Sequence, residues 1–331
     1  MTIKKYVSLL LAVCIALSCT FTVKADTKDN KEYIMKGTWL SFVDMEELLK
    51  NQTKQTFDET FGLICNIIYK NGGNTIFVHV RSHNDAIYPS SVYPWSNHML
   101  NGQDPGYDPL SDMVDIAHHS GLKIHAWINP YGYRQGQISE HPELSSSENI
   151  INGVAEILIR YDVDGIHFDD YFPPVGKEEI NAMIANVHQL CSSKNKLFGI
   201  APQGNIQNNR SMGADVDTWL SKKGYIDYIA PQIYWTDCYG KDEKSMSSDR
   251  LNEWKKLNKA NIPMYVGMAL YRAGNDIEED PGWLKYSDNL AKQAKKAKEL
   301  GYKGYILYNT KSQLSPNEGQ KNELIELKKA W

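Results

Sequence analysis

The chain alternates between short stretches with a two-residue apolar period and longer stretches with a helical period. Residues 75–81 alternate strictly, whereas 148–161 carry aliphatic residues at helical spacing. Successive strand side chains point to opposite faces, and a helix face returns every three or four residues. These periods predict strands at about 37–42, 75–81, 123–130, 166–169, 197–203, 228–235, 264–271 and 305–309. They predict helices at about 56–70, 110–120, 148–161, 177–193, 215–223, 246–260, 289–300 and 317–329.

Eight strands interleaved with eight helices argue for a parallel sheet, and eight such units argue for its closure. We therefore expect an α/β fold, a single (β/α)8 TIM barrel over residues 35–331. Thr56 as N-cap and Glu59 three residues later indicate a capping box at the start of the first long helix. Residues 82–108 show no helical pattern and are rich in aromatic residues, so we expect this loop to form a wall of the cleft.

The N-terminus has the features of a signal peptide. Lys4 and Lys5 precede an apolar run over 7–17, and a small-residue cleavage pattern ends at Ala25. We expect residues 1–25 to be a signal peptide, 26–34 a polar leader, and the mature protein to be secreted or held at the cell surface. Cys19 allows a lipid anchor as a less favoured alternative. After the signal peptide no apolar run approaches the roughly 20 residues of a membrane span.

Composition narrows the range of partners. The net charge is -4 and the pI about 6.2, with both signs mixed along the chain, which does not suggest nucleic acid or an anionic membrane as partner. The spacing of Cys65, Cys191 and Cys238 matches no zinc or redox motif, and Cys65 falls on the apolar face of its helix. We expect no cofactor and a buried, inert Cys65 thiol.

The most informative stretch is DGIHFDDYFPP at 164–174. Strand alternation places Ile166 and Phe168 toward the helices, and His167 and Asp169 toward the barrel interior. The same parity on neighbouring strands gathers polar and aromatic residues on the interior face, near the carboxyl ends where barrel enzymes carry their sites. These residues are His79, Arg81, His125, Trp127, Asn129, His167, Asp169, Gln232 and Tyr234.

The adjacent carboxylates Asp169 and Asp170 suggest glycoside cleavage, which needs one carboxyl group kept protonated as the acid and a second one ionised. Burial and a like charge nearby split two carboxyl pKa values in this way. Strand neighbours point apart, so Asp170 reaches the same site only if the chain bends there. The structural alternative is that Asp170 caps the next turn while Asp169 pairs with Arg81 or a histidine.

Other residues are candidates for holding a sugar. Arg81 suits a carboxylate, Asn and Gln side chains suit hydroxyls, and aromatic faces stack on sugar rings. The candidate substrate-binding residues are Arg81, Asp85, His125, Trp127, Asn129, Tyr131, His167, Tyr171, Gln232, Tyr234 and Trp235. His79, His125 and His167 with Asp169 would alternatively suit a Zn²⁺ site, but no His-x-His or His-x-x-x-His pair supports one.

Several motifs resemble the glycosyl-hydrolase-like family 10 of exported bacterial barrels. They are GTWL at 37, FVHVRSHNDAIYPS at 77, YDPL at 107, HAWINPY at 125, RYDVDGIHFDDYFPP at 160, FGIAPQGN at 198, DYIAPQIYW at 227 and YVGMALY at 265. The resemblance implies a barrel with a glycan-cleaving site, and some relatives look like hydrolases of peptidoglycan sugar strands. The segment after 141–143 is shorter than in relatives, and their arginine-rich element is missing around 175–179.

A remoter likeness to amylase-type barrels implies that Asp169 is the nucleophile, because it ends an Asp-Gly-x-x-x-Asp pattern. Adjacent strand-four carboxylates also occur where the substrate's acetamido group attacks. The fifth strand ends in Pro202-Gln203, so the amylase-type acid position holds no carboxylate, and Asp85 and Asp237 are alternatives to Asp170. We expect an exported glycoside hydrolase acting on a bacterial cell-wall glycan, in particular peptidoglycan sugar strands, or on a related polysaccharide. The alternatives are a non-catalytic carbohydrate-binding barrel and a metal-dependent deacetylase or hydrolase.

Overall fold

The computed structural model describes residues 33–132, 141–170, 172 and 176–331, and Ile34–Trp331 form one compact unit. The expected signal peptide, the polar leader up to residue 32, Cys19 and Tyr171 lie outside the described residues. Within the described ranges, none of the helices combines the length and the apolar character that crossing a membrane requires.

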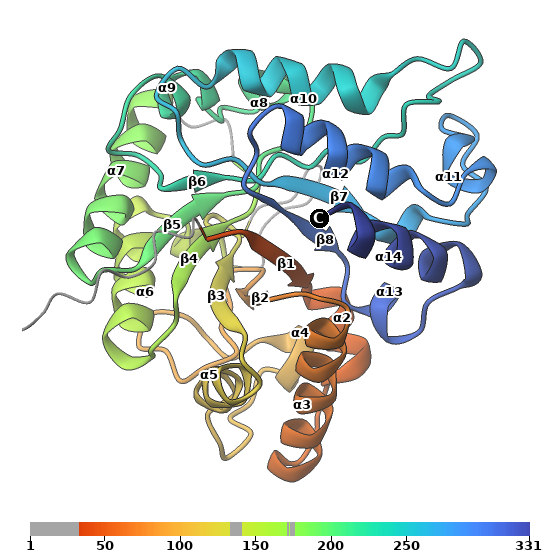
Figure 1. Ribbon diagram of the computed structural model, residues 1–331. Coiled ribbons are helices and arrows are strands. Elements are labelled where there is room, and N and C mark those ends of the chain that lie inside the picture. The colour runs from red at the N-terminus through yellow and green to blue at the C-terminus, as the bar shows by residue number, and fades with distance from the viewer. Residues whose placement is uncertain (1–32, 133–140, 171, 173–175) are drawn as a thin grey trace, which may run out of the picture. The chain divides into compact units, whose positions relative to one another are not determined.

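Eight parallel strands form the expected barrel (Figure 1). They are β1 (Met35–Leu40), β2 (Thr75–Arg81), β3 (Lys123–Ile128), β4 (Gly165–Phe168), β5 (Leu197–Ile200), β6 (Tyr228–Ile229), β7 (Val266–Ala269) and β8 (Gly304–Tyr308). Hydrogen bonds run from β6 through β1 to β7. The circle closes where Ile229 N donates to Pro263 O at 3.0 Å and Tyr265 N donates to Ile229 O at 2.9 Å. The predicted (β/α)8 architecture is confirmed.

The eight predicted helices are present, and they surround the strands (Figure 1). They are α3 (Lys54–Lys70), α5 (Pro109–His119), α6 (Ser147–Arg160), α7 (Lys177–Ser193), α9 (Val216–Ser221), α10 (Met246–Leu257), α12 (Asn289–Glu299) and α14 (Glu318–Ala330). Short helices that were not predicted are α2 (Phe42–Leu48), α4 (Asn97–Leu100), α8 (Ile206–Ser211), α11 (Gly282–Lys285) and α13 (Lys311–Leu314), with 3-10 turns at Pro142–Leu144 and Leu270–Arg272.

The start of α3 differs from the prediction. Thr53 is the N-cap, and its hydroxyl accepts from Thr56 N at 3.3 Å. The capping box of Thr56 and Glu59 is therefore wrong, and Glu59 instead accepts from the Gln55 side chain at 3.0 Å. Cys65 on this helix is buried as expected, and burial raises the pKa of its thiol to about 12.

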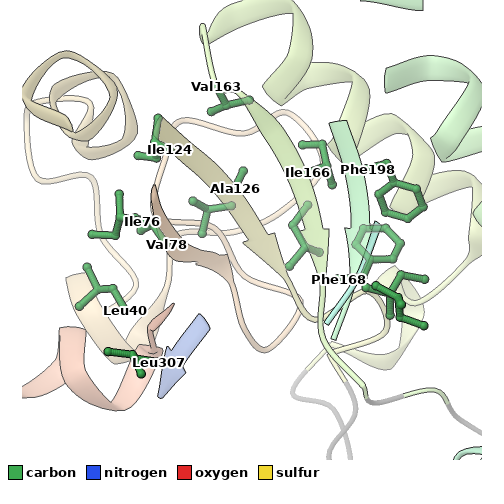
Figure 2. Packing of buried hydrophobic residues seen from close by; sticks show 14 of the residues in the cluster. Leu40, Ile76, Val78, Ile124, Ala126, Val163, Ile166, Phe168, Phe198 and Leu307 are labelled. Atoms are coloured by element: carbon green, nitrogen blue, oxygen red, sulfur yellow. The ribbon is translucent and has the colours of Figure 1, made fainter. Parts of the chain in front are cut away.

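The layer between strands and helices is apolar, as the strand parity predicted. The labelled side chains in Figure 2 belong to this buried cluster, and they include Ile76, Ile124 and Ile166 from three adjacent strands. Phe168 and Phe198 meet edge to face, with centroids 4.9 Å apart and planes at 82°. Such packing fixes the height at which β4 ends, and Asp169 follows directly.

Glycines make room for large rings inside the barrel. At each such glycine, an added Cβ would crowd a ring that comes from another strand of the barrel. The pairs are Gly37 with Phe77 at 2.6 Å, Gly165 with His125 at 2.5 Å, Gly199 with Tyr228 at 2.2 Å, and Gly267 with Trp39 at 3.0 Å. The interior below the mouth is thus filled by aromatic rings, and open space remains at the carboxyl ends of the strands.

Candidate active site

A pocket with about 740 Å³ of non-protein space opens at the carboxyl ends of the strands. All eight strands, or the segments that follow them, supply its lining. The lining residues are Trp39, Ser41, Phe42, Val43, His79, Trp127, Asp169, Asp170, Ala201, Gln232, Tyr234, Tyr271 and Tyr308. This is the end of the barrel where a site was expected.

The chain bends after β4, so that both carboxylates reach the pocket. Asp169 N continues the ladder by donating to Ile128 O at 2.9 Å. The next amide, Asp170 N, turns back to donate to Asp169 Oδ1 at 2.9 Å. Each residue is 5% exposed. The alternative in which Asp169 pairs with Arg81 does not hold, because no such ion pair exists in the described part of the chain and Arg81 lies elsewhere, as shown below.

The environment of Asp170 favours the protonated acid. Burial raises its pKa well above the usual range, and the charge of Asp169 and a hydrogen bond with Asp169 raise it further. A hydrogen bond with the Gln203 side chain opposes part of this rise. A carboxyl group that keeps its proton near neutral pH can donate that proton to a leaving oxygen.

Three tyrosines, which come from the segments after β6 and β7 and from the end of β8, form another part of the pocket wall. The Tyr234 ring lies 6.0 Å from Tyr271 and 6.1 Å from Tyr308, and Tyr271 and Tyr308 lie 5.5 Å apart. Burial is the main cause that raises the pKa of Tyr234 well above 10 and that of Tyr308 to about 12, and the charge of Asp169 raises both further. Tyr234 and Tyr308 therefore keep their protons near neutral pH and can donate to sugar oxygens.

Two indole rings lie among the strand residues of the lining. Trp39 comes from β1 and Trp127 from β3, and their centroids are 6.3 Å apart. Trp127 stacks on His79 at 4.0 Å with an interplanar angle of 14°. Apolar ring faces beside carboxylates and phenols are a combination that suits sugars, which have apolar faces and polar edges.

The structure brings together five of the residues predicted for the site, namely Asp169, Asp170, Trp127, Gln232 and Tyr234. Ser41, Phe42, Tyr271 and Tyr308 were not predicted. Tyr271 and Tyr308 stand at or directly after the ends of β7 and β8, so inspecting every strand end would have found them. Ser41 and Phe42 follow β1 in the same way.

His125 and His167 do point into the barrel, but both are fully buried below the pocket and do not line it. His167 Nδ1 lies 2.9 Å from Tyr228 Oη, and His125 Nδ1 lies 3.0 Å from the same oxygen. These positions do not support direct contact of either histidine with a sugar, because neither ring lines the pocket.

Arg81 corrects the parity prediction. The register of β2 against β3 shifts between His79 and Arg81, so Arg81 pairs with the outward-facing Ile128. A bulge of this kind moves the following side chain to the other face. The Arg81 guanidinium is fully buried and lies 3.5 Å over the Tyr93 ring, outside the pocket.

Asp85, on the loop after β2, and Asn129, directly after β3, make hydrogen bonds with the backbone of the loop after β2. Asp85 Oδ1 accepts from the amides of Ser82 and His83 at 3.1 and 2.9 Å. Asn129 Nδ2 donates to Ser82 O at 3.2 Å. Both side chains are buried and neither lines the pocket, so they shape the loop beside it.

Tyr131 and Trp235 also lie outside the pocket lining. Tyr131 is 2% exposed and packs edge to face on Phe172 at 6.3 Å. Trp235 is half-buried against Gly204, and Arg250 lies 5.8 Å over its ring. Direct sugar contact, predicted for both, is not supported by these positions.

The loop over 82–108 does not form a pocket wall, contrary to expectation. It contains α4, and its rings pack behind Phe42: His83 lies 4.9 Å and His98 5.3 Å from that ring. The residues after β1 form the wall, and the loop supports them.

Within the described residues, no three His, Cys, Asp or Glu side chains are arranged to hold a metal ion. Asp237, one alternative acid, accepts from Ser248 N and Oγ at 2.8 and 2.6 Å and does not line the pocket.

Sequence comparison identifies related glycosyl hydrolases. The model of the family Glycosyl hydrolase-like 10 matches residues 34–145 and 175–285, which flank the segment with both candidate carboxylates. Glycosyl hydrolase YngK of Bacillus subtilis is 28% identical over 291 residues, which cover 65% of this chain and 56% of YngK. Glycosyl hydrolase DigH of Escherichia coli K12 is 28% identical over 340 residues, which cover 76% of each chain. The chain thus spans little more than half the length of YngK.

Solved structures share the architecture. The glycoside hydrolase domain of PgaB (BpsB) from Bordetella bronchiseptica aligns with a TM-score of 0.57 at 10% identity, over 89% of this chain and 99% of that domain. A class V chitinase from Pseudomonas fluorescens Pf-5 aligns with a TM-score of 0.58 at 10% identity, over 90% and 99% of the two chains. At these identities the likeness concerns the fold.

Proposed function

The chain belongs to the Glycosyl hydrolase-like 10 family, and we propose that it is itself a glycoside hydrolase that cleaves O-glycosidic bonds at the pocket lined by Asp169 and Asp170. One observation carries the proposal. Two adjacent carboxyl groups share a buried pocket at the carboxyl end of the barrel, and burial together with Asp169 raises the pKa of Asp170, which favours its protonated form.

The geometry supports distinct roles for the two carboxyl groups. Asp170 is the proton donor to the glycosidic oxygen, because its pKa is raised by burial and by Asp169. Asp169, which follows the last residue of β4, is the ionised partner that stabilises or attacks the sugar carbon. Tyr234 and Tyr308 donate to sugar oxygens, and Trp39 and Trp127 contribute apolar atoms to the pocket lining.

The proposed substrate is a bacterial cell-wall glycan, in particular the sugar strands of peptidoglycan. The family membership, the signal-peptide pattern and the aromatic pocket support this choice. No lysine or arginine is among the described residues that line the pocket. The reacting sugar therefore presents hydroxyl and acetamido groups to the pocket, and any sugar carboxylate lies outside it. We also propose that the protein acts outside the cytoplasm.

The test is the release of reducing ends from peptidoglycan strands stripped of their peptides. Asp169→Asn and Asp170→Asn should each lower the rate by about 10²- to 10⁴-fold, the usual contribution of an acid or base group. Asp237→Asn is the matched control, because Asp237 is hydrogen-bonded to Ser248 away from the pocket. Equal rates for Asp169→Asn and the unmodified protein would remove Asp169 from the chemistry.

A second candidate is a sugar-binding barrel without catalysis. The observation in its favour is Gln203, which stands after β5 where amylase-type barrels carry their acid, and which hydrogen-bonds to Asp170. This alternative expects the unmodified protein to bind stripped glycan strands in a pull-down assay and to release no reducing ends. Turnover that depends on Asp170 would exclude it.

A further inference from the structure

The Trp39 ring is held by a hydrogen bond with His167, which is buried in the barrel interior beneath the pocket. Its Nε1–H donates to His167 Nε2 at 3.0 Å. The far edge of the ring reaches across the barrel to Gly267, where an added Cβ would lie 3.0 Å from the Trp39 Cη2 atom. Trp39 is 1% exposed and lines the pocket. The direction of its indole N–H therefore sets how the ring lies beneath a bound ligand.

This contact determines which nitrogen of His167 carries the proton. An indole N–H can only donate, so Nε2 of His167 must be the acceptor with a free lone pair. A neutral imidazole with an acceptor at Nε2 carries its proton at Nδ1. Nδ1 lies at hydrogen-bond distance, 2.9 Å, from Tyr228 Oη, and the planes of the two rings are within 8° of parallel.

The same Tyr228 oxygen extends the chain of hydrogen bonds to a second histidine. Oη lies 3.0 Å from His125 Nδ1, so it accepts from His167 and can donate its own proton to His125. His125 and His167 are fully buried and Tyr228 is 1% exposed. Gly165 and Gly199 leave space for the His125 and Tyr228 rings.

The surroundings keep both imidazoles neutral. The Phe77 ring lies 4.6 Å from His167 and 4.9 Å from His125. Burial lowers the pKa of His125 to about 3 and the pKa of His167 well below 6.5, and the neighbouring His125 lowers the latter further. A protonated His167 would have two donors and could not accept from Trp39. Neutrality is thus required for the contact.

We propose that His167 is a positioning residue, which in its neutral Nδ1–H tautomer fixes the orientation of the Trp39 ring at the floor of the pocket before a sugar binds. The part of this proposal that concerns the sugar rests on the proposed function, whereas the tautomer does not. The other indole, Trp127, is held by stacking on His79, so the two rings are oriented by different means. A ring that is oriented before binding loses little conformational freedom when the sugar arrives.

Three substitutions separate the contacts of this network. His167→Gln keeps an acceptor for Trp39, whereas His167→Leu removes it. Tyr228→Phe removes the hydroxyl below and leaves the contact between Trp39 and His167 in place. Trp39→Phe keeps an aromatic face and removes the donor. If His167→Leu fails to fold, Trp39→Phe and Tyr228→Phe still test the proposal.

The first measurement is independent of any activity. ¹⁵N-labelled histidine side chains are recorded by NMR between pH 5 and 8 on the whole protein, with His167→Gln and His125→Gln used to assign two of the nine histidines. We expect His167 to show a protonated Nδ1 and an unprotonated Nε2 throughout. In Trp39→Phe we expect the Nε2 resonance to shift. A proton on Nε2, or a charged ring in this pH range, would overturn the proposal.

The second measurement uses the Asp169→Asn background, in which substrate is retained, and an N-acetylated oligosaccharide. His167→Leu should raise the dissociation constant about five- to tenfold, the value of one hydrogen bond. His167→Gln should restore most of the affinity, and Tyr228→Phe should have a smaller effect than His167→Leu. Equal affinity in the Leu and Gln variants would refute the role of the hydrogen bond. If Asp169→Asn binds no glycan at all while the tautomer is as stated, the proposed substrate is wrong and the tautomer stands.

Discussion

Replacing Gly199 with alanine tests whether glycines make room for the rings inside the barrel. A Cβ atom added to Gly199 would lie 2.2 Å from two carbon atoms of the Tyr228 ring. An ordinary contact is 3.4 Å or more, so the ring must retreat by more than about 1 Å, against a packed interior. The retreat moves Tyr228 Oη away from His125 and His167, which lie at 3.0 and 2.9 Å.

The expected magnitude has two parts. Overpacking a well-filled interior destabilises by about 1–3 kcal/mol, and two buried hydrogen bonds contribute about 1 kcal/mol each. Gly199→Ala should therefore lower the free energy of unfolding by about 3–5 kcal/mol. The matched control is Gly62→Ala in α3, where the nearest atom to an added Cβ is 3.9 Å away. Alanine there should stabilise by about 0.5–1 kcal/mol, because glycine is unfavourable inside a helix.

Urea unfolding followed by circular dichroism measures both variants, with the free energy taken from the midpoint at constant slope. The two substitutions should change the free energy of unfolding in opposite directions. A Gly199→Ala protein as stable as the unmodified one would refute the account of the interior. Equal destabilisation by both alanines would show that glycine content, rather than the contact with Tyr228, decides the outcome.

Three further predictions concern charge and chemistry. Asp170→Asn should lower the rate of glycan hydrolysis by about 10²- to 10⁴-fold. It should change the rate little on an aryl glycoside with a dinitrophenolate leaving group, because that group leaves without being protonated. Asp169→Asn should lower the rate on both substrates. Burial raises the pKa of Glu323 from 4.5 to about 7, so the unfolded chain loses this proton at a lower pH than the folded chain. The free energy of unfolding should therefore fall by about 3 kcal/mol from pH 4.5 to 7. Urea titrations at each pH should show this slope in the unmodified protein and not in Glu323→Gln. Burial lowers the pKa of His125 to about 3, so between pH 6.5 and 3 the unfolded chain binds a proton at His125 that the folded chain does not bind. The free energy of unfolding should therefore fall by up to about 5 kcal/mol as the pH is lowered from 6.5 to 3. The fall should be less steep in His125→Gln.

The fold was predictable because each barrel unit is long enough to show its period. The helix α7 occupies the predicted residues, and β2 does as well. The short helices α2 and α4 were missed, since four to seven residues complete too few turns to establish a helical period. The capping box failed because Thr53 and Thr56 are both good N-cap residues three positions apart, and the sequence does not decide between them.

The site was predictable in part, because strand alternation gives the face of a residue but not its height along the barrel. Alternation correctly placed His167 and Asp169 on the interior face. The difference in height makes the difference in function: Asp169 reaches the pocket, whereas His167 is buried beneath it. The bulge at Arg81 has no signature in the sequence, so the parity prediction fails from that residue onward.

The central claim is that the acidic end of β4 is where a glycan is cut. A crystal structure of Asp169→Asn with a bound N-acetylated oligosaccharide tests it most directly. We predict one sugar ring in the pocket lined by Trp39 and Trp127, with the glycosidic oxygen about 2.6–3.2 Å from the Asp170 carboxyl group. An oligosaccharide that binds elsewhere on the barrel, with no glycosidic oxygen within reach of Asp170, would contradict it.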